Sequence, residues 1–123
     1  MAVHVVRTRR DGYVLEHMTG TVDRAWIERS KQTLEERWRA CQEAGVGGIV
    51  VDVRESTMAI DIGDRYDLAV MYAESPMAAI RVAILGKEEQ TTPDRFFQKV
   101  AANRGVQLRV FVDEGEAIAW ARG

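Results

Sequence analysis

The chain has little cysteine, histidine and proline, and it has no long hydrophobic run. Its 123 residues include one cysteine, two histidines and two prolines. A single thiol excludes an intrachain disulfide, and one cysteine with two histidines lacks the ligand spacing of a structural zinc site. No apolar stretch approaches the roughly 20 residues that cross a bilayer. We therefore expect no metal and no membrane insertion.

The charge is close to balanced, with a formal net charge of −2. Basic residues are scattered, which argues against a nucleic-acid partner. Arg7, Arg9 and Arg10 form the nearest approach to a basic cluster, and Glu16 is expected opposite Arg7, so this cluster is interpreted as a solvated strand face. Residues 1–4 lack the pattern of a signal peptide, so we expect a cytoplasmic protein.

Turn and cap signals divide the first half of the chain. Asp11 and Gly12 suit a type I′ turn, which predicts an antiparallel hairpin of residues 3–9 and 13–19. Helical spacing of apolar residues predicts a long amphipathic helix from Thr21, its N-cap, to Gly45. The continuous apolar run 48–53 predicts a central strand that is covered on both faces.

The second half alternates helices and strands. A loop is expected over 54–60, a second helix over 61–74 and a strand over 80–85. Thr92, Pro93 and Asp94 are predicted to open a third helix, with proline at its first position. Gly105 ends that helix.

The last strand passes directly into a capped helix. Residues 108–112 form the strand, and Asp113 with Glu116 makes an Asp-x-x-Glu capping box. The resulting order is β-β-α-β-α-β-α-β-α. It predicts the α/β class, with a single mostly parallel sheet that has an antiparallel N-terminal hairpin strand, and one domain over residues 1–123.

This order resembles the STAS superfamily. The resemblance is carried by the strand patterns at 50–54, 81–86 and 110–113, the last of which runs into the helical residues 116–120. It covers nearly the whole chain from Gly12 onward, and it is nearest to the bacterial sporulation-anti-sigma-antagonist-like branch, which shares its fold with CRAL-TRIO lipid-binding proteins. The resemblance implies a non-enzymatic protein-interaction or regulatory module.

Members of the antagonist branch carry Asp-Ser-Ser-Gly before the second helix, where a serine is phosphorylated to switch partner binding. This chain has Asp61, Ile62 and Gly63 there, so Ile62 replaces the serine and the resemblance implies no switch at that position. Ser56 and Thr57 lie upstream in the expected loop and are alternative phosphorylation sites, although solvated loop hydroxyls are common.

A binding face is predicted where loops follow the parallel strands, together with the second helix. That helix has apolar residues on every side, which suggests a protein partner or a homodimer contact. The candidate partner- or ligand-binding residues are Arg54, Ser56, Thr57, Asp61, Asp64, Leu68, Met71 and Tyr72.

Specific chemistry has weaker support in the sequence. Asp52, Asp61 and Asp64 could supply metal carboxylates, but acids in the first turn of a helix are favoured without any metal. Cys41 is interpreted as a core thiol rather than a nucleophile paired with His4 or His17. We therefore expect no catalytic residue and no cofactor.

Two alternatives to the interaction module remain open. One is a carrier of a small apolar or lipid-like ligand, with a cavity between the sheet and the second and third helices. The other is a small enzyme that uses the carboxylates of residues 54–64, which predicts a raised carboxylate pKa in a cleft. The aromatic residues at positions 26, 38, 96, 97 and 120 are interpreted first as core or interface residues.

Overall fold

A computed structural model describes residues 2–123, apart from the side chains of residues 91, 92 and 94. The strands are β1 (His4–Arg10), β2 (Tyr13–Val22), β3 (Gly48–Met58), β4 (Arg81–Leu85) and β5 (Leu108–Phe111). The helices are α1 (Arg24–Glu28), α2 (Ser30–Ala44), α3 (Ile62–Ala73), α4 (Glu88–Asn103) and α5 (Glu114–Arg122), with a short 3₁₀ turn over Pro76–Ala79.

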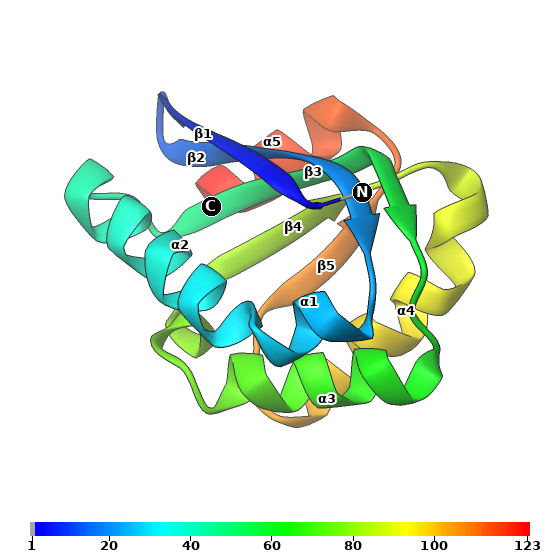
Figure 1. Cartoon of the computed structure of the whole chain (residues 1–123). Helices are drawn as coiled ribbons and strands as arrows, with labels where there is room; N and C mark the ends of the chain where they lie inside the picture. The colour runs from blue at the N-terminus through cyan, green and yellow to red at the C-terminus, as the bar shows by residue number, and fades with distance from the viewer. Residues whose placement is uncertain (1) are drawn as a thin grey trace.

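The strands form one mixed sheet in the order β1-β2-β3-β4-β5. β1 is antiparallel to β2, and the other neighbours are parallel. Helices α1 to α4 cover one face of the sheet and α5 covers the other (Figure 1). The predicted α/β class and the antiparallel N-terminal strand are both confirmed.

The position of β3 in the middle of the sheet explains why its sequence is almost continuously apolar. Val51 packs into the larger core cluster under α1 to α4, whereas Val50 packs with Ala117 and Ala121 of α5. Successive side chains of a strand point to opposite faces, so both faces must be apolar. Gly48 permits a close approach of α5, because a Cβ atom there would lie 1.8 Å from the carbonyl oxygen of Ala121.

The predicted helix end at Gly45 and the predicted N-cap at Asp113 are confirmed, and the second predicted helix also has a cap at its start. Gly45 ends α2 with a left-handed φ of 68°. Asp61 caps α3, with its carboxylate 2.8 Å from the backbone nitrogen of Asp64. Asp113 caps α5, with its carboxylate 2.8 Å from the backbone nitrogen of Glu116, but the Glu116 side chain does not return the hydrogen bond, so only half of the predicted capping box forms.

The prediction for the first helix is wrong at its start. β2 continues to Val22 because it keeps pairing with β3 as far as Met58. Asp23, not Thr21, is the N-cap, and its carboxylate accepts from the backbone of Trp26 at 2.9 Å. The helix is also divided at Arg29 into the short α1 and the long α2.

The loop expected over residues 54–60 is wrong for residues 54–58. β3 runs to Met58, and its last residues pair with β2, for example Glu55 with Thr19. The pairing of β3 with β4 ends earlier, at Asp52 and Leu85. Beyond Asp52, β3 therefore pairs with β2 alone and the two strands form a ribbon at the end of the sheet. This ribbon tolerates polar residues because helices cover only part of it.

The third helix begins four residues before its predicted cap. α4 starts at Glu88, and Pro93 lies inside it. The side chain of Gln90 accepts from the backbone nitrogen of Lys87 at 2.6 Å and so provides an earlier cap than the proline signal suggested. The predicted capping side chains of Thr92 and Asp94 lie outside the described residues.

Candidate functional site

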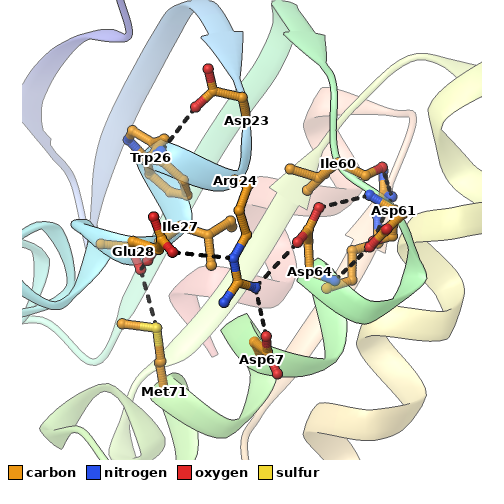
Figure 2. Close-up of polar contacts among 12 residues, drawn as sticks. Asp23, Arg24, Trp26, Ile27, Glu28, Ile60, Asp61, Asp64, Asp67 and Met71 are labelled. Carbon is orange, nitrogen blue, oxygen red and sulfur yellow. Dashed lines mark hydrogen bonds and ion pairs between the residues drawn. The ribbon is translucent and has the colours of Figure 1, made fainter.

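The carboxyl ends of β2 and β3 bring the starts of α1 and α3 together. Arg24 of α1 reaches across to α3, with its Nη1 at 3.2 Å from Asp64 and 2.6 Å from Asp67 (Figure 2). Glu28 lies 3.7 Å from the Arg24 Nε atom. The arginine and its two carboxylates on α3 form what we call the Arg24 clasp.

Asp61 and Asp64 cap the N-terminus of α3. Each side chain accepts from the other residue's backbone N–H, at 2.8 and 3.1 Å, so the two carboxylates close a capping box (Figure 2). The backbone hydrogen bond from Asp61, helped by Arg24, holds the pKa of Asp64 below its ordinary value. Among the described residues, no group of three or more His, Cys, Asp or Glu side chains could hold a metal ion.

Two large apolar side chains on α3 are open to solvent. Ile62 is 58% exposed and Tyr66 is 42% exposed, and they lie one helical turn apart on the same side. Arg104 lies over the Tyr66 ring, 5.1 Å from its centre, and donates to its hydroxyl. Ile62 and Tyr66, with Arg104 packed over the Tyr66 ring, are called the α3 surface.

Two of the predicted binding residues lie in the core. Leu68 is 7% exposed and Tyr72 is 1% exposed. The Tyr72 hydroxyl accepts from Arg37 inside the protein. Met71 is half-buried, with its sulfur 3.4 Å from the Ser30 hydroxyl. A rigid partner therefore cannot reach Leu68 or Tyr72 in this structure.

The interpretation of Arg7, Arg9 and Arg10 as a solvated strand face is confirmed for Arg9 and Arg10, which are exposed, but not for Arg7, which is half-buried. Glu16 does pair with Arg7, at 2.8 Å, but its side chain is fully buried. Arg37 of α2 binds the same carboxylate through Nε and Nη2, at 2.6–3.0 Å, and its own side chain is 2% exposed. We call Glu16, Arg37 and Tyr72 the buried triad.

The triad holds both charges in the interior. Burial alone would raise the pKa of Glu16, but the charges and hydrogen bonds of Arg37 and Arg7 outweigh it and keep that pKa below its ordinary value. Burial opposes the charge of Arg37 as well, and the Glu16 carboxylate raises the pKa of the guanidinium despite it. Both groups stay ionised, as a buried pair requires.

The sequence contains a signal for the buried ion pair of Glu16 and Arg37, because both residues occupy core-facing positions. Arg37 falls between Leu34 and Cys41 at helical spacing, so it occupies a core-facing position of α2. Glu16 alternates with Val14 and Met18, which both point into the core. A charged residue in each of two apolar patterns indicates an internal ion pair.

The polar residues of the β3 ribbon separate into different environments. Arg54 binds Asp52 at 2.8 Å, and burial of Asp52, which would raise its pKa, is outweighed by this pairing. Ser56 is 8% exposed and donates to the Met18 carbonyl at 2.9 Å. Thr57 is exposed. A kinase would have to open the ribbon to reach Ser56.

The interpretation of Cys41 as a core thiol is confirmed. Its side chain is 0% exposed, and burial, followed by the Glu16 charge, raises the pKa of the thiol to about 11. His17 lies elsewhere, with its Nε2 atom 2.5 Å from Glu55. The thiol therefore stays protonated at neutral pH and is not an activated nucleophile.

Two solved structures are similar to this one over almost their full lengths. An anti-sigma factor antagonist from Mycobacterium paratuberculosis has a TM-score of 0.65 and 12% identity, covering 99% of this chain and 96% of its own. An uncharacterized protein of the DUF3478 family from Shewanella loihica PV-4, with a SpoIIAA-like fold, has a TM-score of 0.59 and 20% identity, covering 97% and 93%.

The chain has the SpoIIAA-like fold. This finding agrees with the STAS resemblance of the strand patterns and confirms it at the level of the fold. No protein-family model matches the sequence, and no curated protein matches it either. At these identities the SpoIIAA-like neighbours show the fold alone. None of the described helices is both long and apolar enough to span a membrane.

Proposed function

We propose that the chain is a non-enzymatic regulatory module that binds another protein through the α3 surface. The observation that carries this proposal is the exposure of Ile62 and Tyr66 side by side on one helix. Exposed aromatic and aliphatic side chains with charged neighbours are typical of the centre and rim of a protein interface. One structural neighbour is an anti-sigma factor antagonist, and its name describes action on another protein.

The predicted binding residues contribute unequally to this proposal. Asp61 and Asp64 lie at the edge of the α3 surface, where they hold the end of the helix that carries Ile62. Leu68 and Tyr72 support the helix from beneath, and Met71 lies between α3 and the start of α2. Arg54, Ser56 and Thr57 belong to the neighbouring ribbon.

The position of Ile62 bears on regulation. It is the first residue of α3, directly after the Asp61 cap, and it stands where the antagonist pattern has its switch serine. We propose that partner binding here is not controlled by phosphorylation at this position. Thr57 is an exposed residue and remains the alternative phosphorylation site in the ribbon.

The enzyme alternative has less support than the binding module. It predicts a carboxylate whose pKa is raised in a cleft. Within residues 54–64, Asp64 has a pKa that is lowered instead, and it is bound to Arg24. The neighbouring Asp52, which is bound to Arg54, has a lowered pKa as well. Carboxylates held ionised by arginine are poor general acids.

The proposal is tested by photocrosslinking at the α3 surface. A benzoylphenylalanine residue replaces Tyr66 in the full chain, expressed in the cells that produce it, and a matched variant carries the same group at Gln32, an exposed position of α2. We expect a specific protein adduct from position 66 and none from position 32. Equal adducts from both positions, or none from either, would contradict the proposal.

The predicted homodimer is one form of this interaction. A twofold contact places the same patch of each copy against the other, so Ile62 and Tyr66 of one copy would be covered by the α3 surface of the second. Native mass spectrometry distinguishes a second copy of this chain from a different protein as the partner. A dimer that Ile62→Glu abolishes identifies the second copy as the partner. A monomer that forms the position 66 adduct with a different protein identifies a heterologous partner.

A further inference from the structure

An apolar cavity lies beneath α1, between the sheet and helices α3 and α4. It has a volume of about 50 Å³. Its lining includes the rings of Trp26, Tyr72 and Phe97 and the thioethers of Met18 and Met58. The ligand-carrier alternative places its cavity on this side of the sheet, and the structure adds α1 as a further wall.

The lining favours one type of ligand group. Aromatic rings attract other rings in offset or edge-to-face contact, and thioether sulfur atoms pack favourably against ring edges. Arg37 and Arg65 also line the cavity, and guanidinium groups stack on aromatic faces. All three kinds of contact favour a flat aromatic molecule over an aliphatic one of equal size.

The same lining disfavours a charged ligand. The charge of Arg37 is already balanced by the buried carboxylate of Glu16 at 2.6 Å. Arg65 donates to the backbone carbonyl of Ile60 at 2.8 Å. An anion would have to compete with these short internal bonds after losing its own hydration, so a neutral molecule is preferred.

We propose that this cavity binds a neutral, single-ring aromatic molecule, and that α1 is the wall that moves to admit it. The present volume of about 50 Å³ is well below the roughly 150 Å³ of an engineered apolar cavity that binds benzene, so the cavity must widen to admit a ring. α1 is a five-residue helix that carries Trp26 into the lining and is separated from α2 at Arg29. Figure 2 shows the exposed Arg24 clasp that holds this helix to α3.

Methionine NMR tests the site in the unmodified protein. Met18 and Met58 line the cavity, whereas Met71 and Met77 do not, so methyl-labelled methionine provides both reporters and internal controls. With toluene as the probe, we expect saturable shifts of the Met18 and Met58 methyl signals only. No shift, or equal shifts of all four signals, would overturn the proposal. Methylcyclohexane binding as tightly as toluene would overturn the aromatic preference.

A matched pair of core variants tests the location. Leu68→Ala enlarges the cavity and should tighten toluene binding by about tenfold. Leu34→Ala removes a side chain that is buried but lies outside the cavity lining, so it should leave the affinity unchanged. Equal effects of the two variants would place toluene somewhere else.

A second pair tests the moving wall. Arg24→Gln breaks the clasp and should accelerate toluene exchange, seen as narrower Met18 and Met58 signals at partial saturation. Arg29→Gln removes an exposed arginine from the end of α1 without touching the clasp. Identical exchange rates in the two variants would overturn the role of α1 as the entrance.

Discussion

Two arginines reach toward α3 from neighbouring parts of the chain, and they lie in opposite environments. Arg37 binds Glu16 and Tyr72 with its side chain 2% exposed, whereas Arg24 binds Asp64 and Asp67 with its side chain 51% exposed. In the interior, removing one partner of an ion pair leaves the other charge buried and uncompensated. At the surface, water and dissolved ions solvate and screen the remaining charge. The same ion-pair chemistry therefore has different consequences at the two places.

The difference separates what must stay fixed from what can move. The buried triad joins β2, α2 and α3 around the Arg37 guanidinium, which donates to Glu16 and to Tyr72, so these elements share a single arrangement. The Arg24 clasp joins the short α1 to α3 at the surface, and Ile27 is the one buried side chain that anchors this five-residue helix in the core. We infer that α1 is the more easily displaced element of this face, as the aromatic-ligand proposal requires.

The largest expected effect comes from breaking the triad. Arg37→Met leaves Glu16 buried with only Arg7 beside it, and we expect the free energy of unfolding to fall by about 3–5 kcal/mol. Urea denaturation measures this loss. The double variant Glu16→Leu with Arg37→Met should recover most of it, because no unpaired charge remains. A loss of under about 1 kcal/mol in the single variant would remove the contrast with the surface clasp.

The pH dependence of stability gives an intermediate effect. The pKa of Glu16 is lowered in the folded protein from its ordinary value of 4.5. The stabilisation from this carboxylate is therefore fully present above that pH and is lost as the pH falls through the lower, folded-state pKa. Urea midpoints of the wild type and Glu16→Gln should converge as the pH falls below 4.5. A constant difference would contradict this assignment.

The smallest expected effect on global stability is that of the clasp. Arg24→Gln should leave the urea midpoint equal to that of the Arg29→Gln control, because both side chains are exposed. Hydrogen exchange should nevertheless quicken at the α1 amides of Arg24→Gln alone, since local opening needs less than global unfolding. Equal exchange in both variants would mean that the clasp does not hold α1.

Much of the fold could be predicted because it depends on local patterns. The hairpin at Asp11 and Gly12, the cap at Asp113 and the helix end at Gly45 are encoded within a few residues. The turn is not the predicted type I′, because Gly12 has a positive φ and Asp11 does not. Other errors occurred where a distant segment decided the outcome. β3 extends past residue 54 because β2 pairs with it, and no local propensity shows that partner.

The candidate site was harder to predict for the same reason. Asp61 and Asp64 were found, but Arg24, which lies 40 residues before Asp64, was not. Apolar residues around α3 suggested a partner surface, yet Tyr72 proved to be buried against Arg37, and the exposed side chains are Ile62 and Tyr66. A helical pattern indicates which residues are apolar but not which neighbours cover them.

The sequence by itself determined the α/β class, the order of the elements and the identity of the lone core thiol, because periodicity, turn residues and caps act over short distances. Only the tertiary structure decided that Glu16 and Arg37 would share one buried pair and that Arg24 would close α1 onto α3. Those contacts depend on the parallel crossovers, which bring together side chains that are far apart along the chain.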